Sequence, residues 1–312
     1  MKIGVFDSGI GGLTVANAIS SLLPNEHLVY FGDSEHMPYG EKSPELIQEF
    51  STKITQYLIE EKKCKAVVIA CNTASAVAYN HLKLLYEGQV PIINVIDPMI
   101  ELIVGSSYKK IGIIATRGTV DSNVYQDKLQ RRAPSQDYTV MATPLLASMI
   151  EENFIHDEIS YTIIGKYLSD SKLAGIDALV LACTHYPLIA DDISEYYQHK
   201  VKLLLSGPVV AEKLKVILAK EELLSQNREK ENDYIVSDLT KNFDMSLRTF
   251  NRRFKAATGK APLTYLQELR IANSQDLLKN SNLSILEVCM RVGYQDSAHF
   301  NQLFKKYTSM TP

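Results

Sequence analysis

The sequence predicts an α/β protein: two pseudo-symmetric halves of alternating strands and helices with the active site between them, followed by an all-α C-terminal domain. Three observations support this prediction. Strand-like apolar runs alternate with amphipathic stretches through residues 1–220, which is typical of parallel sheets covered by helices. Short segments of the first half recur in the second. Beyond residue 236 the pattern changes to short helices rich in Arg, Asn, Gln and aromatic residues.

Eight apolar runs in the first part of the chain are expected to be strands, because each is short and rich in branched residues. They are Lys2–Phe6, His27–Phe31, Ala66–Ala70, Ile92–Val95, Lys110–Ala115, Val140–Ala142, Asp177–Leu181 and Lys200–Leu205. Helical patterns lie between them, for example at Ser43–Lys62 and Asn153–Leu173. The charged segment Glu222–Asp233 is the expected linker, and no strand is expected after it.

The most informative repeat ends on a cysteine in each half. Ala66–Ser75 has the sequence AVVIACNTAS and Ala178–Pro187 has ALVLACTHYP. A second pair of similar segments is KIGVFD at Lys2–Asp7 and KIGIIA at Lys110–Ala115. A branched apolar run is typical of a parallel strand buried on both faces, and the residues after it lie at the edge where α/β proteins bind ligands. Cys71 and Cys183 are therefore predicted to face one site at a pseudo-symmetric interface.

Charge is distributed unevenly along the 312 residues. The formal net charge is −3, but the residues from Lys241 onward carry +6, so the preceding 240 residues carry −9. An acidic body joined to a basic tail suggests a small-molecule domain joined to a domain that binds a polyanion. No apolar run is long enough to span a membrane and the N-terminus carries no signal peptide, so a cytoplasmic protein is expected.

The four cysteines show neither a disulfide framework nor the spacing of a zinc site, so reduced thiols and no metal are expected. Cys64 and Cys289 are assigned to core packing. Taken alone, Cys71 or Cys183 would also suit packing, and His185 would suit a turn cap. The doubled cysteine motif, in its doubled strand context, favours the active site.

The glycine cluster after the first strand has two interpretations. Gly9, Gly11 and Gly12 partly match a dinucleotide-binding loop, but Thr14 stands at the position of its third glycine. The favoured interpretation is a tight turn whose backbone amides and following helix hold a carboxylate.

Two thiols that face each other across a bound carbon suit one type of reaction. A thiolate removes a proton from one face and a thiol returns a proton to the other, which is racemisation or epimerisation without a cofactor. The thiolate needs a nearby cation or helix N-terminus, because a free cysteine has a pKa near ~8.5. Asp7 and His185 are the predicted partners of Cys71 and Cys183, respectively.

Residues 1 to about 240 resemble glutamate racemases, of the cofactor-independent aspartate/glutamate racemase superfamily. The matching motifs, in order, are DSGIGG at 7–12, PYG at 38–40, ACNTAS at 70–75, the loop Thr116–Thr119 and ACTHYP at 182–187. Two features depart from the family pattern: Leu205–Pro208 stands where an Asp-Ser-Gly-like turn is expected, and the closing helix after Val236–Asp238 is replaced.

The resemblance implies Cys71 and Cys183 as the acid/base pair, assisted by Asp7, Glu151 and His185. It implies a pocket for L- or D-glutamate lined by Ser8, Pro38, Tyr39, Gly40, Asn72, Thr73, Thr116, Thr119 and Thr184. It also implies no pyridoxal phosphate or other cofactor, a homodimer, and a supply of D-glutamate to peptidoglycan. The choice of glutamate over aspartate depends on this resemblance alone, chiefly on PYG and ACTHYP.

The basic tail is expected to contain two helix-turn-helix units. Ser246 is a good N-cap for a helix to about Ala257, a longer helix is expected at Leu263–Asn280, and further helices at Ser284–Arg291 and Ser297–Tyr307. On this plan Leu247, Phe250 and Phe254 are buried in the first unit, and Phe300, Leu303, Phe304 and Tyr307 in the second. The outward positions, predicted to contact DNA, are Arg248, Asn251, Arg252 and Lys255, and Ala298, Asn301, Gln302 and Lys305.

This tail, over about 236–312, resembles the AraC-type DNA-binding domain, so double-stranded DNA is the implied partner. The markers are MSLRTFNRRFKAATGKAP at 245–262 and VGYQDSAHFNQLFKKY at 292–307. A generic helical dimerisation tail is the alternative, and the charge of +6 with paired turns favours DNA.

Three domains are therefore expected: Rossmann-like halves at 1–98 and 99–235, with a return to the first half after about 206 left open, and the DNA-binding domain at 236–312. Three functions follow. The first, favoured because both cysteines are present, is a working racemase with an appended DNA-binding domain. The second is a transcriptional regulator whose racemase-like body senses glutamate. The third is a chimeric chain in which one half is a passenger.

Overall fold

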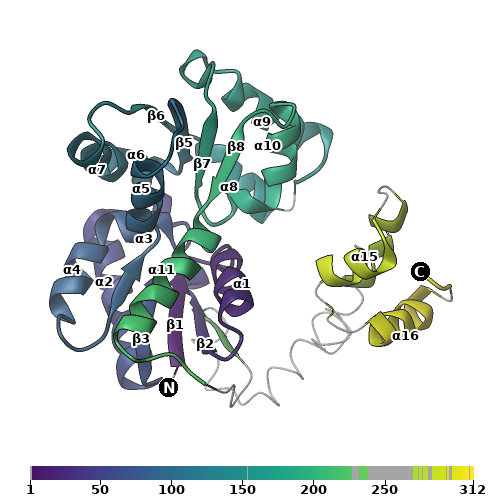
Figure 1. Cartoon of the computed structure of the whole chain (residues 1–312), viewed down its shortest axis with the longest axis horizontal. Helices are drawn as coiled ribbons and strands as arrows, with labels where there is room; N and C mark the ends of the chain where they lie inside the picture. Colours follow the sequence, from purple (N-terminus) through teal and green to yellow (C-terminus); the bar gives the residue numbers. More distant parts are fainter. Residues whose placement is uncertain are drawn as a thin grey trace. The chain divides into compact units, whose positions relative to one another are not determined.

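The computed structural model describes residues 2–152, 154–226, 232–237, 270–272, 274–275, 277–279, 283–292, 294, 297–308 and 310–312. The chain divides into two compact units, Met1–Leu239 and Thr240–Pro312. The first unit is α/β and contains two parallel sheets, as Figure 1 shows.

The first sheet has the strand order β4-β3-β1-β2-β9, and all its pairings are parallel. Its strands are β1 (Lys2–Asp7), β2 (His27–Gly32), β3 (Cys64–Ile69), β4 (Ile92–Asn94) and β9 (Asp233–Val236). The second sheet has the order β6-β5-β7-β8, again parallel throughout. Its strands are β5 (Lys110–Ala115), β6 (Asp137–Ala142), β7 (Ala178–Ala182) and β8 (Lys202–Leu205).

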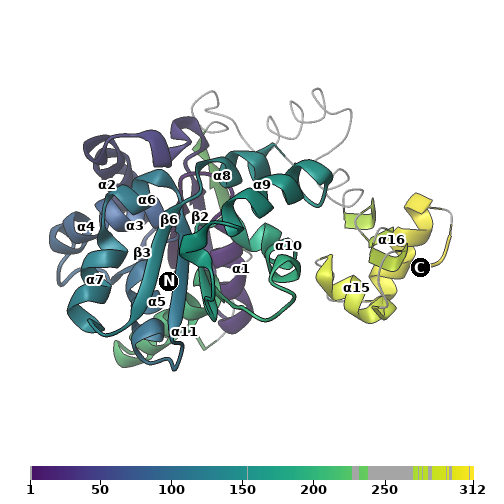
Figure 2. The ribbon, with the colours of Figure 1, turned by 90° about the horizontal axis from the view of Figure 1, so that it is seen from above.

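Helices cover both faces of both sheets. In the first half they are α1 (Leu13–Leu22), η1 (Ser34–His36), η2 (Tyr39–Glu41), α2 (Pro44–Glu60), α3 (Asn72–Val77), α4 (Tyr79–Leu85) and α5 (Ile96–Val104). The second half and the return to the first contain α6 (Arg117–Asp121), α7 (Val124–Arg132), α8 (Pro144–Glu151), α9 (Glu158–Leu168), η3 (Ser171–Leu173), η4 (Tyr186–Ile189), α10 (Ala190–Tyr196) and α11 (Ser206–Lys220). Figures 1 and 2 both show α7 on one side of the second sheet and α8, α9 and α10 on the other.

Alternate residues of the central strands enter different cores, as expected for strands buried on both faces. In β7, Val180 packs into a core that also holds residues of α1, α5, α7 and α11, whereas Leu179 and Leu181 pack with α8, α9 and α10. The first of these cores contains strands from both sheets, so it joins the two halves into one body. A third core lies between the first sheet and the helices α2 and α4.

Local signals explain where several helices begin. Ser43 caps α2 by accepting a hydrogen bond from the Leu46 amide, and Pro44 at the first helical position fits this start. Asp157 and Ser160 form a reciprocal capping box at the start of α9. In α11, Gly207 lies against α1, since a Cβ there would be 3.1 Å from Ala18 Cβ. The segment that departs from the family pattern, Leu205–Pro208, therefore joins the end of β8 to the packed first turn of α11.

The eight predicted strands all occur, with ends that differ by a few residues, and the two predicted helical stretches contain α2 and α9. The prediction that strands end before the linker is wrong. β9, at Asp233–Val236, pairs with β2 and completes the first sheet. The segment DYIV is only four residues long and lies beside a highly charged stretch, so its strand character depends on the partner edge that β2 supplies.

The second unit is helical in its described residues. Ser284 caps α15 (Ile285–Arg291) through a capping box with Glu287, and α16 (Ser297–Thr308) follows. Phe300, Leu303 and Phe304 are buried in a small core with Val288 and Cys289, as predicted. The predicted helix from Ser246 to about Ala257 lies outside the described residues, with Leu247, Phe250 and Phe254. The predicted helix Leu263–Asn280 is described only from residue 270 onward, where its described residues are helical. Within the described ranges, no helix is long and apolar enough to cross a membrane.

Candidate active site

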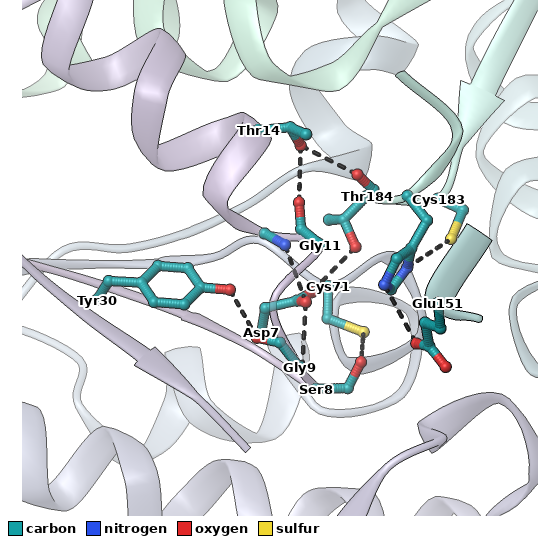
Figure 3. Close-up of polar contacts among 12 residues, drawn as sticks. Asp7, Ser8, Gly9, Gly11, Thr14, Tyr30, Cys71, Glu151, Cys183 and Thr184 are labelled. Atoms are coloured by element: carbon teal, nitrogen blue, oxygen red, sulfur yellow. Dashed lines mark hydrogen bonds and ion pairs between the residues drawn. The ribbon is translucent and has the colours of Figure 1, made fainter. Parts of the chain in front are cut away.

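Four strands end at one cleft between the two halves. Asp7 is the last residue of β1, and Cys71 lies two residues after the end of β3. Thr116 and Cys183 directly follow β5 and β7. Since β1 and β3 are parallel neighbours in one sheet, and β5 and β7 in the other, their carboxyl ends supply matching pairs of side chains. Figure 3 shows Cys71 and Cys183 approaching the same region from the two halves.

A small cavity of about 40 Å³ lies between these strand ends. The cavity is lined by Ser8, Pro38, Tyr39, Gly40, Cys71, Asn72, Thr73, Thr116, Ala147, Glu151, Cys183, Thr184 and His185. Of the predicted site residues in this unit, only Asp7 and Thr119 do not line it. Both are fully buried directly behind its wall.

Asp7 organises the glycine turn. Its Oδ2 accepts hydrogen bonds from the amides of Gly9 (3.2 Å) and Gly12 (2.9 Å), and its Oδ1 accepts one from Thr184 Oγ1 (3.2 Å). The turn amides, predicted to hold a carboxylate, thus bind the side chain of Asp7. Burial raises the pKa of Asp7, although the nearby His185 charge opposes this effect. Through Thr184, Asp7 also links the turn of the first half to the second half, as Figure 3 shows.

Gly11 allows the two halves to approach closely at this turn. A Cβ at residue 11 would lie 2.7 Å from the His185 ring, closer than real Cβ contacts. Thr14 Oγ1, one turn further on, donates to the carbonyl of Thr184 (3.1 Å). The residue that breaks the dinucleotide-binding pattern therefore fixes the motif that carries Cys183.

Cys71 is 5 % exposed and caps α3. Its Sγ accepts from the Ala74 amide at 3.5 Å and donates to Ser8 Oγ at 3.7 Å. Burial and the nearby Asp7 raise the pKa of Cys71 to about 12, so this thiol is protonated at neutral pH.

Cys183 lies beside a histidine. Its Sγ is 3.7 Å from His185 Nδ1, and His185 Nε2 is 3.1 Å from Glu151 Oε1, with the ring N–H not aligned on that oxygen. Burial lowers the pKa of His185, but the Cys183 and Glu151 acceptors outweigh it and raise the pKa to about 11. The ring is therefore an imidazolium at neutral pH, and its positive charge lies beside the Cys183 sulfur.

Hydroxyl groups and a buried tyrosine also lie at the cavity, with Thr73, Thr116 and Tyr39 in its lining and Thr119 behind it. Thr73, Thr116 and Thr119 form a triangle of hydroxyls with Oγ1–Oγ1 distances of 3.0, 3.1 and 3.4 Å. Tyr39, in the PYG motif, is 1 % exposed, and burial followed by the Asp33 carboxylate raises its pKa, so its phenol is neutral. Hydroxyls of this kind can bind the carboxylates and ammonium group of an amino acid.

Sequence reasoning missed two contributors. Ala147 of α8 lines the cavity, but an alanine carries no chemical signal in a sequence. Tyr30 of β2 donates from its OH to the Gly9 carbonyl (2.7 Å) and so fixes the turn from behind. A tyrosine inside a buried strand is a signal that could have identified it, because a buried phenol needs a partner.

The predicted DNA contacts fall in two groups. Arg248, Asn251, Arg252 and Lys255 lie outside the described residues. Ala298, Asn301, Gln302 and Lys305 all lie exposed on α16, opposite its buried side. Across the described parts of both units, no group of three His, Cys, Asp or Glu residues could hold a metal ion.

Comparisons with known proteins match two families to this chain. Residues 4–214 match the Asp/Glu/hydantoin racemase family, and residues 239–312 match a helix-turn-helix domain. A glutamate racemase of Neisseria meningitidis is 40% identical over 258 residues, which cover 82% of this chain and 93% of the relative.

Two solved structures are also similar. A glutamate racemase of Francisella tularensis, in complex with D-glutamate, has a TM-score of 0.70 and 36% identity and covers 78% of this chain and 90% of its own. A glutamate racemase isoform of Bacillus anthracis has a TM-score of 0.70 and 32% identity, covering 83% and 94%. The predicted racemase with an AraC-type tail is thereby confirmed. The chain belongs to the Asp/Glu/hydantoin racemase family, as an isomerase of the amino-acid racemase kind with a helix-turn-helix domain at its C-terminal end.

Proposed function

We propose that this chain interconverts L- and D-glutamate by proton transfer between two cysteines, with no cofactor. The single observation that carries the proposal is that Cys71 and Cys183, at equivalent strand ends of the two halves, line one small cavity. Glutamate is the proposed substrate because the similar proteins named above are glutamate racemases.

In the proposed reaction the two cysteines take different roles. The Cys183 thiolate, stabilised by the His185 imidazolium, removes the Cα proton of one enantiomer. The Cys71 thiol then donates its proton to the opposite face of the planar carbanion. In the reverse direction Cys71 becomes the base, and the Ala74 amide and Ser8 hydroxyl are placed to stabilise its thiolate.

Other residues hold the substrate and the acid/base pair. Glu151 holds the His185 ring from the cavity side, and Asp7 holds the glycine turn. Polar groups for the carboxylates and ammonium group come from the pocket residues Ser8, Asn72, Thr73, Thr116 and Thr184.

We propose that a homodimer acts in the cytoplasm and that its D-glutamate is used for peptidoglycan.

The test is proton NMR of L-glutamate in D₂O with the full chain and no added cofactor. Loss of the Cα–H signal together with the appearance of D-glutamate supports the proposal, because the proton returned by a thiol exchanges with solvent. A persistent Cα–H signal with folded protein would exclude racemisation.

A regulator that senses glutamate is the second candidate, favoured by the helix-turn-helix match at 239–312. It predicts that a chain inactive in the NMR test still binds glutamate, and that glutamate changes its affinity for double-stranded DNA. A racemase with an unaffected DNA affinity would exclude this candidate.

A further inference from the structure

The last strand of the first sheet brings the end of the racemase unit back to the cleft. β9 pairs with β2 in parallel register, and Val236 lies opposite Gly32. Ser237 directly follows β9, and Asp33 directly follows β2. The segment matched by the helix-turn-helix domain begins at residue 239, two residues after Ser237.

The Ser237 hydroxyl is buried and uses both of its hydrogen-bonding roles. It donates to Asp33 Oδ1 at 2.8 Å and accepts from the Glu35 amide at 2.9 Å. The residue is 6% exposed. A hydroxyl with its donor and an acceptor both engaged defines the position of the groups it contacts.

Asp33 connects Ser237 to Tyr39, which lines the cavity. Its Oδ2 accepts from the Tyr39 hydroxyl at 2.6 Å, and both its oxygens lie 2.9 Å from His36 Nδ1. The His36 ring stacks on the Phe50 ring, with the two ring centroids 3.8 Å apart. The centroid of the Tyr39 ring lies 6.2 Å from that of Phe50. Asp33 is 2% exposed, so water does not replace these bonds.

We propose that Ser237 is a positioning residue for the amino-acid pocket, which acts by holding Asp33 and through it Tyr39. This inference rests on the proposed glutamate racemase function. It makes the junction with the DNA-binding segment part of the substrate site, because a backbone change that moves Ser237 removes a bond from the loop that carries Tyr39.

The test compares full-length variants by their kcat and KM for both glutamate enantiomers. Ser237→Ala is expected to raise KM about three- to tenfold with kcat within about twofold, since the cavity wall loosens and the thiols are untouched. Ser237→Thr, which keeps the hydroxyl, is expected to restore KM. A KM for Ser237→Ala equal to that of the wild type would overturn the proposal.

Ser225→Ala is the matched control in the same returning segment. The Ser225 hydroxyl also binds a buried carboxylate, that of Glu26 (2.9 Å), but neither residue lines the cavity. It is expected to lower the melting temperature and leave KM unchanged. An equal rise of KM in Ser225→Ala would show that general loosening, not positioning, explains the effect.

A double-mutant cycle with Tyr39→Phe identifies the route. If Ser237 acts through the Tyr39–Asp33 bond, Ser237→Ala changes KM less in the Tyr39→Phe background than in the wild type. Additive effects of the two substitutions on KM would contradict this route.

Whether the wild type turns over glutamate tests the proposed function separately. Should the wild type not turn over, the dissociation constant of D-glutamate, measured by calorimetry, gives the same comparison between variants.

Discussion

At the scale of single residues, the two thiols differ in their surroundings although their strands are equivalent. Cys71 lies near an acidic group, Asp7, and its pKa is raised to about 12, whereas Cys183 has the imidazolium of His185 beside it. Asp7 beside Cys71 and His185 beside Cys183 thus give the two sulfurs different electrostatic surroundings. This difference comes from His185 and Asp7, which lie within the paired segments at positions where the other copy has Thr73 and Ala115, respectively.

Replacing either thiol is expected to abolish racemisation in both directions. Cys71→Ala and Cys183→Ala each remove one of the two proposed proton carriers, and we expect a loss of at least ~10²–10⁴-fold, the usual contribution of general acid–base catalysis. Circular dichroism of the glutamate enantiomers measures it. Cys64→Ala is the control, because this buried thiol begins β3 and does not line the cavity. Full activity in either catalytic variant would refute the two-base mechanism.

His185 is expected to stay charged well above its ordinary pKa of 6.5. Because folding raises its pKa to about 11, the charged ring contributes stability that is fully present below pH 6.5 and lost as pH rises towards 11. The difference in unfolding free energy between wild type and His185→Gln should therefore shrink as pH rises through this window. Imidazole NMR gives a second readout, and a ring that titrates near pH 6.5 in the folded protein would contradict the expectation.

At the scale of elements, a buried ion pair ties the segment after α11 to the first sheet. Lys65 of β3 and Glu26, before β2, lie 2.6 Å apart with side chains 3% and 1% exposed. Ser225 binds Glu26 by its amide and hydroxyl, and Lys65 also donates to the Leu223 carbonyl. This cluster holds the chain on its way from α11 to β9.

Breaking this pair is expected to destabilise the first unit strongly. Lys65→Met leaves the Glu26 carboxylate buried without its cation, which usually costs about 3–5 kcal/mol of unfolding free energy. Urea unfolding measures it. Lys53→Met, which removes the exposed pair with Glu49 on α2, is the control and should leave the urea midpoint unchanged. Equal effects of the two variants would show that burial does not matter here.

At the scale of the whole molecule, the acidic racemase unit and the basic tail are expected to act on different ligands. The double variant Arg252→Ala/Lys255→Ala removes two cations from the predicted DNA-contacting face. DNA affinity should fall and the slope of log affinity against log salt should decrease by about 2, with racemisation unchanged. Fluorescence anisotropy with a duplex, at several salt concentrations, gives both quantities. An equal fall in turnover would contradict the two-module organisation.

Most of the cleft was predictable, because the residues concerned follow strands that the sequence marks clearly. The runs before Cys71 and Cys183 are apolar enough to indicate buried strands without any partner. Glu151, by contrast, was implied only by family resemblance, since it ends a helix, α8, whose approach to His185 depends on packing. Ala147 and Tyr30 have no motif, and their roles appear only when α8 and β2 are in place.

By itself the sequence determined the alternating fold, the two cysteine-bearing strand ends and the basic helical tail. These depend on local periodicity, on the residue that follows each apolar run and on charge composition, all of which are read along the chain. Only the tertiary structure decided that DYIV is a strand, that the turn amides bind Asp7, and that Ser237 contacts Asp33. Each of these needs a partner from a distant part of the chain, because an edge strand or a buried hydroxyl is defined by the group that satisfies its hydrogen bonds.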